Sequence, residues 1–186
     1  MTREQEIKII TRIKNGESAL FNGLVLVHAP RILSIVRGIV GNREDAQEIA
    51  QDVFVKAFFS LHSFRGDSSF STWLCRIAYN MSISCTRKRK QIIVPLDETN
   101  IAVCKEEFHY YENETDKNEY IALYEMINKL PPDERFLIIS FYLHKKSVAE
   151  ISSITGMSEI NVKVRLHRIR KKLSICAKEK MEVMYG

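Results

Sequence analysis

The stretch SVAEISSITGMSEINVKVRLHRIRKKL, residues 147–173, has the pattern of two short helices joined by a tight turn. Ser147 followed by Glu150 is a capping box, in which each side chain accepts a hydrogen bond from a free backbone N–H of the first turn. Gly156 supplies the positive φ that ends the first helix, and Ser158 caps the second. The second helix carries one apolar face, made of Val162, Leu166, Ile169 and Leu173. We therefore predict a helix-turn-helix at this end of the chain.

The opposite face of the second helix is polar and basic near its start. Its centre carries Ile160, Val164 and His167, and its surround consists of Asn161, Lys163, Arg168, Arg170, Lys171 and Lys172. Apolar and hydrogen-bonding groups inside a basic rim suit a major groove, where base edges are read at the centre and phosphates are held at the rim. The alternative is a surface helix that is merely basic.

Outside this segment the apolar residues also recur with helical spacing, and we predict an all-α protein. The expected helices cover residues 3–14, 18–40, 43–61, 70–89, 118–129, 133–143, 147–155 and 159–179. Pro30 lies inside the second helix, which should therefore kink or break there. Residues 94–118 are acidic with weak periodicity and predict a flexible linker. The fold expected is two small helical domains joined by an acidic linker.

The charge distribution follows the same division. Residues 1–90 hold 14 Lys or Arg against 8 Asp or Glu, residues 91–118 hold 2 against 7, and residues 119–186 hold 12 against 8. Two basic lobes joined by an acidic segment indicate two surfaces for a polyanion and a connector that avoids it. Solvated charge with no partner is the alternative at this point.

Localisation and redox state follow from the absence of certain patterns. No run approaches the roughly 20 apolar residues that cross a bilayer, and the first ten residues lack the apolar core of an export signal, so we expect a cytoplasmic protein without membrane insertion. The four cysteines form no CxxC pair, and we expect reduced thiols: Cys75, Cys85, Cys104 and Cys176.

No catalytic constellation is evident. The five histidines are isolated, and no GxSxG, HExxH or phosphate-binding glycine loop is present. The acidic residues lack the spacing of a calcium loop. We expect no enzymatic activity, no cofactor and no metal.

The expected helix over residues 43–61 has two faces of different character. One face is a core stripe of Ala46, Ile49, Ala50, Val53 and Ala57. The face pointing away from it carries Glu48, Asp52, Val55 and Phe59. Exposed apolar side chains beside carboxylates are typical of a protein-binding helix, unless another helix of the same domain covers Phe59.

Three stretches, taken together and in this order, resemble the extracytoplasmic-function (ECF) group of RNA polymerase sigma factors. REDAQEIAQDVFVKAF is similar to region 2.2, FRGDSSFSTWLCRIAYNMSISCTRKRK to regions 2.3 and 2.4, and LPPDERFLIISFYLHKKSVAEISSITGMSEINVKVRLHRIRKKL to region 4. The chain departs from the family at HAPRIL, where an aromatic residue and no proline is more usual. The resemblance implies a region 2 domain over residues 1–92, a linker over 93–117 and a region 4 domain over 118–186.

The resemblance also implies roles for particular residues. The region 2.2 helix would dock on the β′ clamp helices of core RNA polymerase through Glu48, Gln51, Asp52 and Phe59, and region 4 would contact the β flap. Region 2 would hold the minus-10 promoter element as a single strand through Phe64, Arg65, Arg76, Asn80, Arg87 and Lys88. Region 4 would read the minus-35 element as duplex through Lys163, Val164, Arg165, His167 and Arg168. An anti-sigma protein that covers these surfaces is a further implied partner.

Phe64 and Phe70 bracket a polar loop, and an aromatic ring at its start could stack on a base that has left the duplex. Trp73 is expected to lie buried between the helices, with stacking on a base as the alternative. The alternative function is a conventional helix-turn-helix regulator that binds duplex DNA without polymerase core. A helical RNA-binding protein is a third class, although no RNA module is evident.

Overall fold

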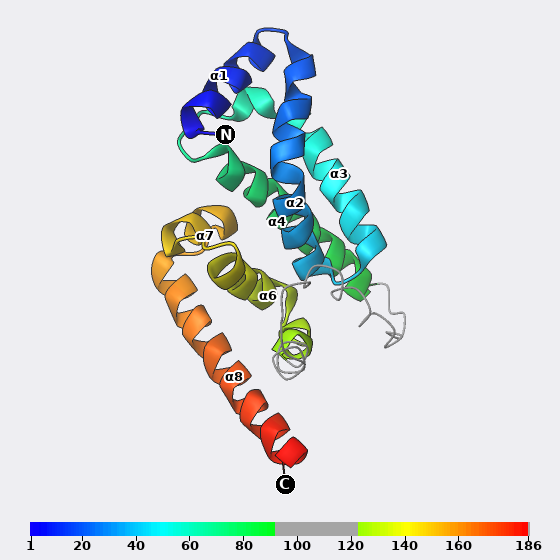
Figure 1. Cartoon of the computed structure of the whole chain (residues 1–186), viewed down its shortest axis with the longest axis vertical. Coiled ribbons are helices and arrows are strands. Elements are labelled where there is room, and N and C mark those ends of the chain that lie inside the picture. Colours follow the sequence, from blue (N-terminus) through cyan, green and yellow to red (C-terminus); the bar gives the residue numbers. More distant parts are fainter. Residues whose placement is uncertain (92–122, 186) are drawn as a thin grey trace.

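The computed structural model describes residues 1–91 and 123–185, with side chains over 1–88 and 123–177. All regular structure in these ranges is helical, which confirms the predicted fold class (Figure 1). The N-terminal helices are α1 (Arg3–Lys14), η1 (Ser18–Leu20), α2 (Phe21–Val40), α3 (Arg43–Phe59), η2 (Leu61–Ser63) and α4 (Phe70–Gln91). The C-terminal helices are α6 (Pro132–Ile138), η4 (Ile139–Leu143), α7 (Val148–Thr155) and α8 (Glu159–Tyr185). The predicted linker over 93–117 lies outside the described residues.

The helix boundaries follow from local capping chemistry. Thr2 forms a capping box with Gln5 at the start of α1, and the Asn42 side chain accepts a hydrogen bond from the Asp45 N–H at the start of α3. Gly41 ends α2 with φ +81°, a left-handed conformation that glycine adopts without a Cβ clash. The helices expected from the sequence therefore agree with those observed at most of their ends.

Pro30 does not break α2. The sequence predicts a kink or a break at Pro30, and of these the break is absent, since the helix runs without interruption from Phe21 to Val40 with Pro30 inside it. Pro30 is exposed, and on the opposite side Leu24, Ile32 and Ile35 are buried in the core. By length and composition Ser18–Val40 would also suffice to cross a membrane, contrary to the expectation that no apolar run is that long. In this fold the inward face of α2 packs against α3 and α4.

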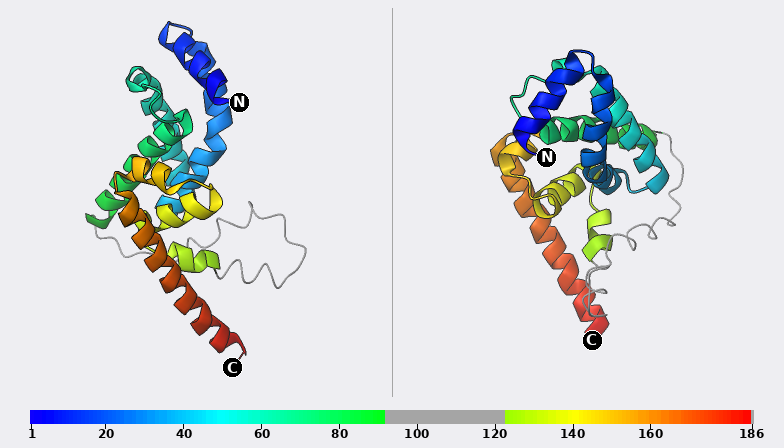
Figure 2. Two further views of the ribbon diagram at one scale, coloured as in Figure 1. Left: turned by 90° about the vertical axis from the view of Figure 1, so that its left-hand side faces the viewer. Right: turned by 45° about the horizontal axis from the view of Figure 1, so that its top comes forward.

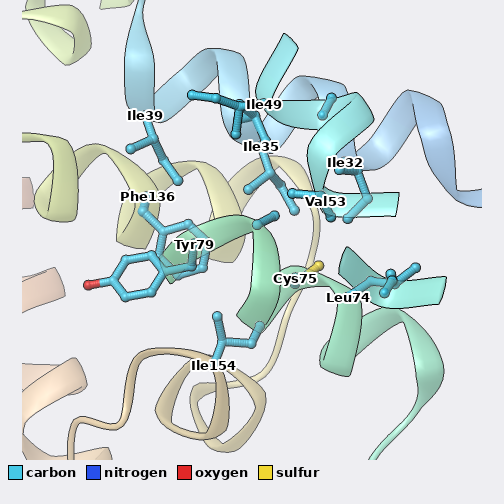
Figure 3. Packing of buried hydrophobic residues seen from close by; sticks show 14 of the residues in the cluster. Ile32, Ile35, Ile39, Ile49, Val53, Leu74, Cys75, Tyr79, Phe136 and Ile154 are labelled. Atoms are coloured by element: carbon cyan, nitrogen blue, oxygen red, sulfur yellow. The ribbon is translucent and has the colours of Figure 1, made fainter. Parts of the chain in front are cut away.

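The core of the N-terminal helices forms where α2, α3 and α4 cross. Figure 3 shows Ile35 of α2 and Val53 of α3 directed toward Leu74 and Cys75 of α4. Each of these four side chains is buried. All residues of the core stripe predicted for α3 are buried as well, which confirms the prediction for this face of the helix. Burial of this kind is the main favourable term in folding.

The C-terminal helices pack directly against the N-terminal ones (Figure 2). Buried residues of both form one continuous hydrophobic core. The Tyr79 ring of α4 lies 4.6 Å, centroid to centroid, from the Phe136 ring of α6. The Arg135 guanidinium donates a hydrogen bond to the Ile39 carbonyl (2.7 Å), and the Thr72 hydroxyl donates one to the Glu150 carboxylate (3.2 Å). α4 contacts α7, and α2 contacts α6.

The edge of this contact is polar around His144. Its Nε2 lies 3.4 Å from the Ser34 hydroxyl of α2. Burial, together with the charges of Arg31 and Lys146, lowers the pKa of His144 to about 4. The imidazole is therefore neutral at physiological pH, and it adds no third positive charge between Arg31 and Lys146.

Candidate nucleic-acid interface

The helix-turn-helix is formed by α7 and the start of α8. Ser147 and Glu150 form the predicted capping box, Gly156 ends α7 with φ +74°, and the Ser158 hydroxyl accepts a hydrogen bond from the Asn161 N–H. The predicted apolar face of α8 is buried at Val162, Leu166 and Ile169, and Leu173 packs at its edge. This local structure confirms the prediction made from residues 147–173.

The opposite face of α8 is open to solvent. Ile160 is 75% exposed and Val164 42% exposed, and around them Lys163, His167 and Arg168 are exposed as well. No hydrogen bond or ion pair joins these three polar side chains to another described residue. Four of the five residues predicted to read the minus-35 element are thus presented together on one surface.

Arg165, the fifth, is only partly exposed because its guanidinium pairs with the Asp133 carboxylate of α6. About two turns further along α8, the Lys172 ammonium pairs with the Glu134 carboxylate of α6 at 3.0 Å. The two ion pairs brace α8 against α6. The main role of Arg165 in this structure is therefore to hold the exposed face of α8 in place against α6.

The basic residues predicted for the minus-10 element lie along one exposed strip of α4. Arg76, Asn80 and Arg87 follow at i, i+4 and i+11 and all are exposed, and Lys88 is exposed beside Arg87, about 100° around the helix from it. The opposite side of α4 is buried at Phe70, Leu74, Cys75 and Ala78. Because the helix rises about 1.5 Å per residue, the strip from Arg76 to Lys88 is about 18 Å long. That length accommodates several nucleotides of a single strand.

Phe64 is placed differently from the other predicted residues. Its ring is 6% exposed and packs against Phe70 and Trp73 at centroid distances of 5.6 and 5.4 Å. In this conformation it offers no face to a base. Trp73, expected between the helices, is partly buried on this cluster at the head of the α4 strip. Arg65, the next residue along, is exposed.

The acidic and apolar face of α3 is exposed along its whole length. We call Glu48, Asp52, Val55 and Phe59 the α3 stripe; Gln51 is exposed at its edge. Phe59 is 79% exposed and Val55 54% exposed, so no other described helix covers them. Phe59 makes an edge contact with Phe58, which packs on Phe21 of α2. Solvent exposure of so large an apolar side chain favours a protein-binding surface.

Two cationic side chains near the 64–69 loop escaped the sequence reasoning. Arg3 and Lys14 lie at the two ends of α1, and both donate hydrogen bonds to backbone carbonyls of that loop. The contacts join residues 50 or more positions apart, and no local pattern signals them. Over the described residues, no cluster of three or more His, Cys, Asp or Glu could hold a metal ion. Cys75, Cys85 and Cys176 are free thiols, and Cys104 lies outside the described ranges.

Comparison with known proteins matches both halves of the chain to one family. Residues 24–92 match the model for Sigma-70 region 2, and residues 120–173 match that for Sigma-70, region 4. The ECF RNA polymerase sigma factor SigW of Bacillus subtilis is 31% identical over 176 residues, which cover 89% of this chain and 93% of that relative. The RNA polymerase sigma-H factor of Pseudomonas aeruginosa is 41% identical over 80 residues, 42% of its length.

A solved structure supports the fold. The sigma factor RpoE from Bartonella quintana, in a co-crystal with the anti-sigma factor NepR, aligns with a TM-score of 0.71 at 22% identity over 85% of this chain and 96% of that chain. The two family models, found in the same order as the two basic lobes, agree with the full-length similarity to SigW. The chain is all-α, has a helix-turn-helix after a three-helix core, and matches both sigma-70 regions in this order. It belongs to the ECF RNA polymerase sigma factors.

Proposed function

We propose that this protein binds core RNA polymerase and directs it to promoters with a minus-10 and a minus-35 element. Residues 1–92 form the core-binding and minus-10 domain, residues 93–117 the connector, and residues 118–186 the minus-35 domain. The protein acts in the cytoplasm as an initiation factor and supplies no catalytic group of its own. Core polymerase carries out the chemistry of transcription.

The observation that carries this proposal is the exposed α3 stripe. Phe59 and Val55 cost free energy when they face water, and the carboxylates of Glu48 and Asp52 beside them repel DNA. A regulator that worked on duplex DNA alone would gain nothing from such a surface. A protein partner with a basic and apolar groove, such as the β′ clamp helices of polymerase, would bury the rings and pair the carboxylates.

The α4 strip and the 64–69 loop then hold the displaced minus-10 strand. Arg76, Arg87 and Lys88 contact phosphates, since guanidinium and ammonium groups along one exposed strip match the spacing of a charged backbone. Asn80 lies between them, and its side-chain amide can both donate to and accept from a base edge. Arg65 extends the contact into the loop. Phe64 supports the loop from below.

The recognition face of α8 enters the major groove of the minus-35 element. Val164 and Ile160 would contact thymine methyl groups or exclude polar edges, and His167 and Arg168 would donate hydrogen bonds to bases or phosphates. Lys163 binds a phosphate at the rim. Region 4 also contacts the β flap of polymerase, which sets its distance from region 2.

An anti-sigma protein is the proposed inhibitory partner. The Bartonella quintana relative is bound to the anti-sigma factor NepR in its crystal structure. A protein that covers the α3 stripe would compete with core polymerase for the same exposed apolar residues.

The test is reconstitution with core polymerase and a promoter fragment. We expect an open complex and a transcript of defined length only when this protein and core are both present. The double variant Asp52→Arg/Phe59→Ala should lose both, while keeping its helix content. Duplex promoter binding by the free protein with no core-dependent transcript would favour the conventional regulator instead.

A further inference from the structure

The 64–69 loop is held from inside the fold at both of its ends. At the first end the Phe64 ring is buried against Phe70 and Trp73. At the other end Ser69 caps α4, because its hydroxyl accepts a hydrogen bond from the Thr72 N–H at 3.1 Å. Between these anchors Gly66 adopts φ +84° with open space around it. The middle of the loop therefore needs another support to keep one conformation.

That support comes from α1. The Lys14 ammonium donates a hydrogen bond to the Phe64 carbonyl (2.6 Å), and the Arg3 guanidinium donates one to the Gly66 carbonyl (3.0 Å). A bond from a charged donor is stronger than a neutral one, and the Lys14 bond is partly shielded from water. The two bonded carbonyls flank Arg65, whose own side chain is exposed. Their orientation sets the backbone from which that guanidinium projects.

The two cations reach the loop from opposite ends of α1. Eleven residues of helix separate Arg3 from Lys14, which corresponds to about 16 Å. Carbonyls two residues apart lie no more than about 7 Å from each other. The side chains must therefore converge on the loop, as the two ends of a clamp do. A shift of α1 would change both contacts together.

α1 is itself fixed to the residues that the loop rests on. The Glu6 carboxylate lies 3.0 Å from His28 Nε2 of α2, with both side chains buried, and Ile10 and Ile13 are in the core. The His28 ring makes an edge contact with Phe70, the first residue of α4, at 5.4 Å. α1, the loop and the start of α4 thus form one packed unit. The matched region 2 model begins only at residue 24, so α1 lies outside it.

We propose that α1 clamps the 64–69 loop, and that Lys14 and Arg3 are positioning residues that fix the loop backbone around Arg65 and thereby set base selectivity at the minus-10 element. This inference rests on the proposed function of the loop. It assigns a role in promoter selectivity to a helix that lies outside the residues proposed to contact DNA.

The first test uses the free protein. Hydrogen–deuterium exchange of a peptide covering residues 64–69 should be about 5- to 10-fold faster in Lys14→Met and in Arg3→Met than in the parent, because each change removes a charge-assisted bond. Lys8→Met is the matched control: Lys8 is exposed on the same helix and has no partner among the described residues. Lys14→Arg keeps a charged donor and should restore slow exchange.

The second test measures selectivity with core polymerase. Opening rates on promoters that differ at one minus-10 position should show selectivity about 5- to 10-fold lower in Lys14→Met than in Lys8→Met, with affinity for core unchanged. If Lys14→Met melts early, Arg3→Met carries the test, since Arg3 is exposed. Unchanged exchange in both variants, or faster exchange with unchanged selectivity, would overturn the clamp. A different outcome separates this proposal from the proposed function. If hydrogen exchange changed as expected but the parent protein gave no core-dependent opening, the proposed sigma-factor function would be wrong, while the support of the loop by α1 would stand.

Discussion

The resemblance to sigma factors predicts that Phe64 and Asn80 both take part in base recognition, but the two side chains lie in different surroundings. Phe64 is 6% exposed within an aromatic cluster, whereas Asn80 is exposed on the α4 strip. Phe64→Ala should lower the free energy of unfolding by about 3 kcal/mol, since it leaves a cavity. Asn80→Ala should change it by less than about 0.5 kcal/mol and relax base preference at one minus-10 position.

Urea unfolding of the two variants, paired with opening assays on promoters that differ at single minus-10 positions, checks this. A Phe64→Ala protein that is as stable as the parent but fails to open the promoter would restore the ring as a direct DNA contact.

Lys163 and Val164 are neighbours on α8 with different expected roles. Lys163→Ala should weaken minus-35 binding for all sequences and reduce the log-log salt slope by about 0.9, the value for one lost phosphate contact. Val164→Ser should change base preference with little change of slope, since an apolar group facing the groove reads a thymine methyl. Binding isotherms at several salt concentrations distinguish the two. Identical behaviour of the variants would mean that the face of α8 has been assigned incorrectly.

At the scale of single elements, the helices were predictable because their signals are local. Capping residues such as Ser147 and glycines such as Gly41 and Gly156 act on the backbone within one turn of their own position. The helix ends that they mark can therefore be predicted from the sequence. Of the kink or break expected at Pro30, the break is absent because Pro30 lies on the exposed side of a helix whose opposite side is buried against α3 and α4. Packing energy on that buried side outweighs the missing hydrogen bond.

The α3 helix carries a prediction of its own. Asp52→Arg together with Phe59→Ala should weaken binding to core polymerase by about 1 to 4 kcal/mol, the usual cost of truncating an anchor at an interface. The melting temperature should stay the same, because Phe59 is 79% exposed. Gln47→Ala, an exposed change on α3 outside the stripe, is the control. Early melting of the double variant would indicate that the Phe59 ring belongs to the fold.

At the scale of the whole molecule, the two domains share one core, and that arrangement was beyond sequence reasoning. Burial of Tyr79 against Phe136, the bond from Arg135 to Ile39 and the anchoring of the loop by Lys14 all join residues at least 50 positions apart. Periodicity reports which face of a helix is apolar, and it does not report which helix covers that face. The α8 residues expected to contact DNA could be placed on one face because helical periodicity is a local signal, whereas the burial of the Phe64 ring against Phe70 and Trp73 depends on how the loop folds back onto α4.

The contact between domains can be tested with a wedge. A Cβ placed on Gly38 of α2 would come within 2.3 Å of Ile139 Cδ1 of η4. Cδ1 is the free end of the Ile139 side chain and can turn aside for a single methyl group, but Cγ1 and Cγ2 of Ile139 lie at 3.6 and 3.8 Å from the same position. The two additional methyl groups of Gly38→Val should meet these atoms as well, loosen the contact between the domains and raise the radius of gyration above that of the parent. Gly23→Val in the same helix meets nothing within 4 Å and should leave it unchanged. Small-angle scattering measures both; equal radii would contradict the close packing of the domains.

In the proposed function, α3 brings the protein to polymerase and α4 then holds an opened strand. The most direct measurement is the fluorescence of 2-aminopurine placed across the minus-10 element, with core polymerase in excess. The parent protein should raise the fluorescence only when core is present, and Asp52→Arg/Phe59→Ala should abolish the rise while Gln47→Ala retains it. A rise with the protein alone, or an undiminished rise with the double variant, would contradict the claim.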